Sequence, residues 1–243
     1  MLLIDIRKKF QQRLTETSID FISEITTDSF ELKESKLEGK KDKDISEPLK
    51  KVTITGFKKS SFDQIWKLNL EPENTLLKSS AKVTEIALIT LSHAHKLLTV
   101  YLIEMKSSIV GKPPKKDRLK NIHDKLNESI GRFYHLVLIN IHDEVEYEGF
   151  EVKFKGVIFF NRDEVKRNAK GQIDCSQFGD SRQICKIFTN QKREGTLLCD
   201  TFLGSNVILV KFIQNPNKDK KTGKFSNNFS VDIDSFLYSP PRK

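Results

Sequence analysis

The sequence predicts a mixed α+β (α/β) fold, with a central mixed sheet flanked by helices and a β-rich C-terminal extension. Two apolar, β-branched runs at 83–90 and 97–105 enclose the polar break 92–96, as strands of a β-hairpin do. A helical apolar period follows at 117–130, and another apolar strand at 134–141. A hairpin followed by a helix and a strand is typical of a mixed sheet with a helical crossover.

The remaining elements fall before and after this central passage. Residues 2–25 carry one apolar stripe at helical spacing, whereas 33–51 is dense in charge and predicts a flexible loop. A short β-branched run follows at 52–57, and 62–70 contains the only tryptophan, Trp66. Further strands are expected at 151–160, 184–188, 197–203, 207–213 and 229–236. We therefore expect a core at 1–145 and a β-rich region at 146–243 packed on it.

Composition bounds the function. The chain has 243 residues and a formal net charge of +9, which permits a nucleic-acid partner without requiring one. Because 37% of the residues are hydrophobic, a disordered chain is excluded. The sequence has no run of about 18 apolar residues, so it predicts no transmembrane helix. In MLLIDIRKKF the charged residues follow the apolar start, whereas in a signal peptide they precede the apolar stretch. Cys175, Cys185 and Cys199 are expected to be reduced thiols in a cytoplasmic protein.

Charged residues interrupt the two apolar strands of the hairpin. Glu104 and Lys106 share a face of the second strand, either as a solvated ion pair or as part of a site. If the hairpin is symmetric about the 94–95 bond, Glu85 lies opposite Glu104 with Cβ atoms about 4.5–5.5 Å apart. Opposed carboxylates repel, and Mg²⁺ (or Mn²⁺) held by Glu85 and Glu104 would remove the conflict. Lys106 could then orient or deprotonate a water.

These residues lie in the passage TEIALIT…LLTVYLIEMKSS, followed by DRLKNIHDKLNESIGRFYHLVLIN. An acid, an apolar hairpin ending in E-x-K, a helix and a strand together resemble the core of the PD-(D/E)XK nuclease superfamily, over residues 80–141. The resemblance implies a restriction-endonuclease-like fold, with Glu85 as first acid, Glu104 as second acid and Lys106 as motif lysine. It also implies Mg²⁺-dependent hydrolysis of phosphodiester bonds.

The chain departs from that family in two places. The first acid is Glu85 instead of the usual Asp, and no Pro precedes it. Many members carry a Gln on the following helix, where this chain offers Asn121, Asp124 and Lys125 as alternatives.

Basic residues follow the E-x-K strand and enter the helix. Such residues would contact a phosphate backbone beside the metal, although an ordinary solvated loop would have the same composition. They are Lys112, Lys115, Lys116, Arg118 and Lys120.

Three functions remain open at this point. The first is a metal-dependent nuclease acting on DNA or RNA, in a defence system of the restriction or CRISPR-associated kind. The second is a catalytically inactive, nuclease-like subunit that binds nucleic acid or joins a complex. The third is a protein–protein interaction subunit. A homodimer or larger complex is compatible with each of them.

Overall fold

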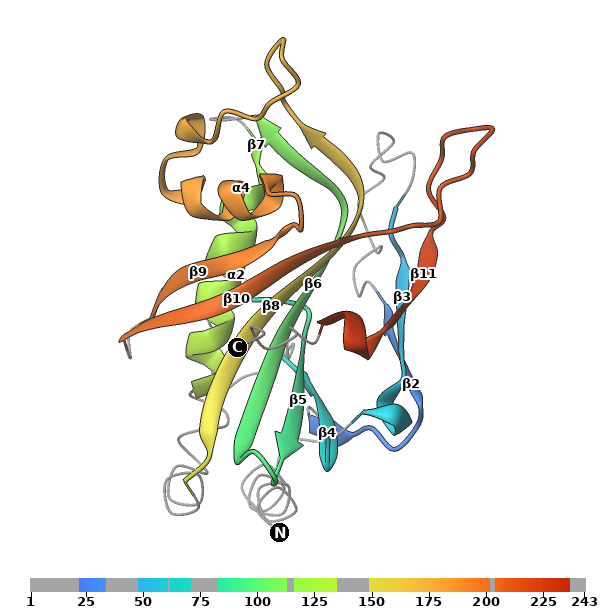
Figure 1. Ribbon diagram of the computed structural model, residues 1–243, viewed down its shortest axis with the longest axis vertical. Helices are drawn as coiled ribbons and strands as arrows, with labels where there is room; N and C mark the ends of the chain where they lie inside the picture. Colours follow the sequence, from blue (N-terminus) through green and yellow to red (C-terminus); the bar gives the residue numbers. More distant parts are fainter. Residues whose placement is uncertain are drawn as a thin grey trace, which may run out of the picture.

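The computed structural model describes residues 22–33, 48–60, 62–70, 83–112, 116–134, 149–201 and 204–236. The fold is sheet-dominated α+β, and its larger sheet is mixed, as the sequence predicts (Figure 1). Most of the predicted N-terminal helix, the middle of the charged loop 33–51, and residues 135–141 of the predicted strand lie outside the described residues.

Eight strands form the larger sheet, in the order β1-β4-β5-β6-β8-β10-β9, with β7 paired to β6. Their bounds are β1 Ile22–Glu24, β4 Gln64–Asn69, β5 Ile86–Ser92, β6 Leu97–Lys112, β7 Lys116–Asp117, β8 Glu151–Val165, β9 Glu194–Thr201 and β10 Gly204–Gln214. β4, β5 and β6 are antiparallel neighbours, whereas β6, β8 and β10 run parallel. Ligands of open sheets commonly bind near the carboxyl ends of such parallel strands.

Different layers cover the two faces of this sheet. α2 (Arg118–Phe133), α4 (Arg182–Thr189) and η3 (Cys175–Ser181) pack on one face. A smaller sheet, β11-β3-β2, covers the other with η4 (Ile233–Phe236) (Figure 1). Its strands are β2 Ser29–Lys33, β3 Lys51–Thr55 and β11 Asn228–Asp232, and η1 (Phe57–Lys59) follows β3. The described α-helices therefore lie on one face only, because a second sheet and η4 occupy the other.

The central hairpin is as the sequence predicts. β5 and β6 pair antiparallel with Ile86 opposite Ile103 and Ala87 opposite Leu102, which is the register of a turn centred on the 94–95 bond. Both strands are buried on both faces, since Leu102 lies in the cluster beneath α2 and Tyr101 in the cluster beneath the smaller sheet. The hairpin is thus the middle of the fold.

The helix α2 is the crossover between β6 and the parallel strand β8. Its buried stripe is Leu119, Ile122, Leu126 and Ile130. At Gly156 of β8 an added Cβ would lie 3.1 Å from a Leu126 methyl, so a glycine here lets the helix approach the sheet closely. The predicted helical period ends at 130, but the helix continues through the buried Gly131 to Phe133.

Three secondary-structure predictions are wrong, one of them at 233–236, where the 3-10 helix η4 replaces the end of the strand expected at 229–236. Residues 22–24 form strand β1 on the edge of β4 instead of the end of a helix. Residues 184–188 lie in helix α4 instead of a strand, because Ile184, Ile187 and Phe188 recur at helical spacing and bury one face.

The C-terminal half completes the same sheets that the N-terminal half begins. β8 pairs with β6, and β11 pairs in parallel with β3. The expected boundary between 145 and 146 falls outside the described residues. No helix in the part of the chain that the structure describes has the length and apolar character needed to cross a membrane.

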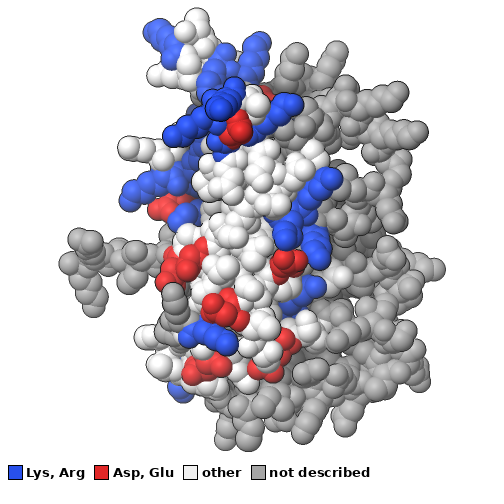
Figure 2. Space-filling view, turned by 90° about the vertical axis from the view of Figure 1, so that its right-hand side faces the viewer, with Lys and Arg blue, Asp and Glu red and all other residues white. Residues whose placement is uncertain are grey.

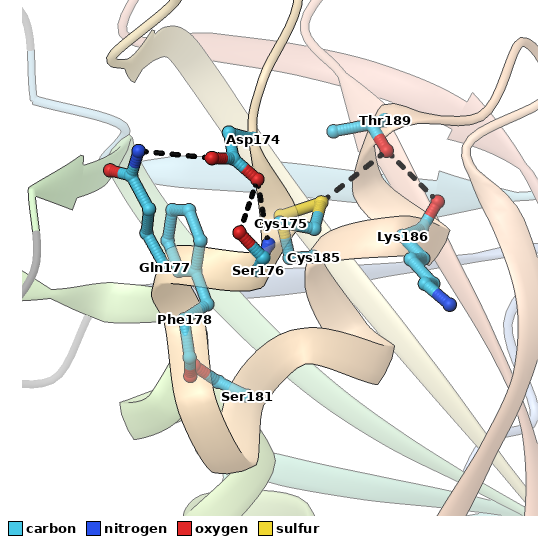
Figure 3. Close-up of a disulfide and its surroundings, with 9 residues drawn as sticks. All are labelled: Asp174, Cys175, Ser176, Gln177, Phe178, Ser181, Cys185, Lys186 and Thr189. Atoms are coloured by element: carbon cyan, nitrogen blue, oxygen red, sulfur yellow. Dashed lines mark hydrogen bonds between the residues drawn. A yellow bond between two sulfur atoms is a disulfide. The ribbon is translucent and has the colours of Figure 1, made fainter.

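The prediction that all three cysteines are reduced is wrong. Cys175 of η3 and Cys185 of α4 form a disulfide (Figure 3). Asp174 caps this turn by accepting hydrogen bonds from the Ser176 hydroxyl, the Ser176 amide and the Gln177 side chain, which lower the pKa of its carboxyl. Cys199 is free and buried, and burial raises its pKa to about 12.

Candidate active site

Strand β6 places a carboxylate in the middle of the fold. Glu104 is fully buried and lies on the face of β6 that α2 covers, following Val100 and Leu102 in the alternation of the strand. Lys106, two residues on, shares that face and pairs with Glu104 Oε1. A buried carboxylate costs several kcal/mol of desolvation unless it is paired, so this position demands cationic partners.

Helix α2 supplies the second cation. Lys125 Nζ lies 2.7 Å from Glu104 Oε1. Of the three residues that the sequence left open on this helix, the structure therefore brings Lys125 to the carboxylate. Lys125 adjoins Leu126 and Ile122 on the helix surface, so the burial of their stripe directs it at the sheet. Both ammonium groups are largely shielded from solvent.

The second oxygen of Glu104 has no such partner. Glu104 Oε2 is buried and accepts no hydrogen bond from the described residues. A buried carboxylate oxygen without a donor is costly, and in native structures such an atom commonly faces a water, an ion or a substrate. The carboxylate thus has one oxygen held by two lysines and one oxygen that receives no hydrogen bond from the described residues.

The first acid of the predicted pair, Glu85, lies just before strand β5. The β5–β6 ladder begins at Ile86 opposite Ile103, and Glu85, which is partly buried, precedes it by one residue. The segment entering β5 is fixed by α2, because the Thr84 amide donates to Ser129 Oγ at 2.7 Å. Ser129 lies one turn beyond Lys125, so the same helix holds the Glu104 carboxylate and the approach to Glu85.

A divalent cation fits the donor chemistry of this centre. Within the described ranges no group of three or more His, Cys, Asp or Glu side chains is arranged to hold a metal. Mg²⁺ does not require such a group, since it commonly binds one or two carboxylates and completes its shell with water and phosphate oxygens. Glu104 Oε2, which has no donor among the described residues, together with Glu85 at the start of the paired strand would suit that smaller requirement.

The predicted phosphate-contacting residues are only partly described. Lys115 lies outside the described residues, as do the side chains of Lys112 and Lys116, whose backbones belong to β6 and β7. Arg118 donates to the Ser108 carbonyl at 3.1 Å, and Lys120 is half-exposed with its Nζ 3.9 Å from Asp180. Arg118 thus fixes the start of α2 to β6, and Lys120 remains on the surface.

Two segments of the described chain carry a marked excess of positive charge. The segment 161–193 has eight Lys and Arg against four Asp and Glu, and the hairpin loop 214–228 has four against one. The formal net charges of these two segments are therefore +4 and +3. Both segments extend from the carboxyl ends of β8 and β10, and Figure 2 shows Lys and Arg gathered at the upper end of its face.

The hairpin loop 214–228 has a defined conformation. Asp219 accepts hydrogen bonds from the backbone N–H groups of Thr222 at 2.7 Å and Lys221 at 2.8 Å, and these bonds lower the pKa of its carboxyl. Lys218 and Phe225 form a bridge across the loop, with the ammonium over the ring. The exposed lysines 220, 221 and 224 are therefore presented on an ordered loop.

Comparison with known proteins adds no relative: no family model matches the chain, and no curated protein or solved structure is significantly similar to it. The resemblance to the PD-(D/E)XK nucleases stays a hypothesis that depends on the residues and their arrangement.

Proposed function

We propose that the protein is a metal-dependent nuclease that hydrolyses phosphodiester bonds of DNA or RNA. The observation that carries the proposal is the buried Glu104 carboxylate, held by Lys106 and Lys125 through one oxygen and open at the other. The hairpin β5–β6 followed by the helix α2 also supports the proposal, and the strand that the resemblance puts at 134–141 lies largely outside the described residues. The positive end of the molecule supports a polyanionic substrate.

In this proposal Glu104 and Glu85 would hold Mg²⁺, which when bound supplies Lewis acidity and lowers the pKa of a water. Lys125 orients the carboxylate of Glu104, so that its Oε2 stays directed at the open position. Lys106 donates either to the attacking water or to a phosphate oxygen and balances negative charge beside the metal.

The alternative of binding without cleavage has one observation in its favour. Two lysines already neutralise Glu104, and the described residues offer no third acid at the centre. A centre in that state could stabilise the fold while the basic loops bind nucleic acid.

A location in the cytoplasm is part of the proposal, and the disulfide would there be exposed to cellular reductants.

The test is a cleavage assay on plasmid DNA, single-stranded DNA and RNA, with Mg²⁺, Mn²⁺ or chelator. We expect cleavage that requires the metal, and a loss of about 10³-fold or more in Glu104→Gln and Lys106→Met. Metal-independent cleavage, or a Glu104→Gln variant as active as wild type, would contradict the proposal. Salt-sensitive binding with no cleavage of any substrate would favour the inactive, binding-only alternative.

Matched controls come from the opposite end of β8. Glu151→Gln and Lys153→Met make the same chemical changes at exposed residues that pair with each other. Glu151 is seven ladder positions from the level of Glu104, or about 23 Å along the sheet. Both control variants should cleave at the wild-type rate.

A further inference from the structure

We propose that an open pocket beside the Glu104 centre binds one unpaired, phosphorylated nucleotide of a single-stranded nucleic acid. The pocket lies between the loop that follows β8 and the turn that joins α4 to β9. Its volume is about 620 Å³, within the range of small-molecule sites. The inference rests on the proposed function for its substrate class but is tested separately from cleavage.

Two arginines converge on one carboxylate in the wall of the pocket. Arg167 and Arg193 each place a terminal guanidinium nitrogen near Asp163 Oδ2, the latter at 3.4 Å. Arg167 also donates to the Val165 carbonyl, and Arg193 to Gln214 Oε1. Each guanidinium has five N–H donors, so both retain donors beyond these bonds, and the group keeps a net positive charge. This arrangement suits a phosphate, which arginine binds in a bidentate manner.

Aromatic packing fixes one of these arginines in place. The Arg193 guanidinium lies 5.1 Å from the ring centroid of Phe160 and 5.3 Å from that of Phe188. The residue also has a positive φ of 52°, a conformation that a non-glycine residue adopts only when its surroundings hold it there. Arg193 is therefore a preorganised donor, whereas Arg167 is the more exposed of the pair.

The rest of the lining suits a nucleotide better than a bare anion. Phe188 is buried beneath the Arg193 guanidinium, whereas the exposed side chains of Gln172 and Gln191 carry both donors and acceptors. Unpaired bases are commonly bound by stacking on arginine guanidinium planes and by side-chain hydrogen bonds to their edges. A base still paired in a duplex would not present those edges, so the pocket favours a single strand.

The position of the pocket connects it to the candidate active site. Phe160 is the ladder partner of Lys106, and neighbouring strands lie about 4.8 Å apart, so their side chains are adjacent on one face. The guanidinium of Arg193, in the pocket wall, lies over the same Phe160 ring and donates to Gln214. A strand whose phosphate reaches Lys106 could therefore place a neighbouring nucleotide in the pocket.

The test measures binding in chelator, so that no cleavage occurs. Fluorescence anisotropy of a labelled single-stranded oligonucleotide is compared between wild type, Arg167→Gln, Arg193→Lys and the control Lys166→Gln. Lys166 is exposed, adjacent in sequence and absent from the pocket lining, so its variant loses the same charge. We expect about tenfold weaker binding for Arg167→Gln and for Arg193→Lys, since each loses guanidinium bonds to phosphate, and less than about twofold for Lys166→Gln.

A competition experiment tests the class of ligand. A nucleoside 5′-monophosphate should displace the oligonucleotide from wild type, whereas the unphosphorylated nucleoside should do so far less well. Equal binding by Arg167→Gln and Lys166→Gln, or no displacement by the monophosphate, would overturn the proposal. If cleavage occurs but Arg167→Gln binds like the control, only the pocket proposal fails. If the arginine variants lose binding but wild type never cleaves, only the nuclease proposal fails.

Discussion

Two clusters in this protein each consist of one carboxylate that accepts hydrogen bonds from two cationic side chains. Their surroundings differ, since one cluster is buried and the other is partly exposed to solvent. Glu104 is fully buried, and Lys106 and Lys125 are 17% and 15% exposed. Asp163 is 12% exposed, and its partners Arg167 and Arg193 are 40% and 29% exposed. One cluster is covered by a helix, and the other lines an open pocket.

The difference indicates a division of work. Removing water strengthens electrostatic interactions, so a buried carboxylate with an open oxygen suits metal binding and catalysis. A solvent-facing pair of arginines suits recognition, because guanidinium groups are weakly hydrated and match the geometry of phosphate. The buried cluster contains lysines and the pocket cluster contains arginines. The ring of Phe160 contacts Arg193 of the second cluster and pairs in the ladder with Lys106 of the first.

Removal of each carboxylate should have very different effects on stability. Glu104→Ala leaves two shielded ammonium groups without their partner, and we expect a loss of about 3–5 kcal/mol in the free energy of unfolding. Asp163→Ala leaves arginines that water can reach, so the expected loss is about 1 kcal/mol or less. Urea denaturation measures both. Equal losses would show that the burial contrast has no energetic consequence.

The disulfide should matter for the pocket more than for the Glu104 centre. Ile173 precedes Cys175 by two residues and Phe188 follows Cys185 by three, so the bond joins two segments that line the pocket. Closing a loop with a sequence separation of 10 contributes about 2.5–3 kcal/mol, so Cys175→Ser/Cys185→Ser should lose that much stability. The double variant should also bind the oligonucleotide more weakly.

Thiol titration checks the disulfide directly. Without reductant, the folded protein should show almost no reactive thiol at pH 8, because a pKa of about 12 leaves only about one Cys199 in 10⁴ as thiolate. Unfolding in denaturant should expose one thiol per chain, and added reductant should raise the number to three. Three thiols without reductant would show that the disulfide does not form.

The hairpin loop should contribute to recognition by charge alone. Replacing Lys220, Lys221 and Lys224 by Gln should weaken oligonucleotide binding at low salt. For a single strand, the slope of log K against the logarithm of the salt concentration should become shallower by about two. Affinities measured over a salt series test this. An unchanged slope would place the bound strand away from the loop and leave the pocket as the main contact.

The register of the central hairpin could be predicted because it depends on local symmetry. Two apolar runs of similar length around one turn leave few pairings that bury both strands, and the pairing of Ile86 with Ile103 follows.

The choice of Lys125 over Asn121 and Asp124 required the rotation of α2 on the sheet. Its neighbours Ile122 and Leu126 carried that information as members of the buried stripe.

The pocket could not be predicted, because loops distant in sequence bring its parts together. Arg167 and Arg193 are 26 positions apart, and only the packing of α4 against β9 and β10 makes them converge on Asp163. The misassigned segment 184–188 belongs to that packing. Its apolar residues at helical spacing were the signal that could have identified α4.

Direct metal binding tests the central claim, that the buried cluster is a cation site and the open cluster is not. Mn²⁺ titration followed by electron paramagnetic resonance should show a site in wild type and in Glu151→Gln. That site should be lost in Glu104→Gln and retained in Asp163→Asn. Loss of Mn²⁺ binding in Asp163→Asn with retention in Glu104→Gln, or no binding by folded wild type, would contradict the account.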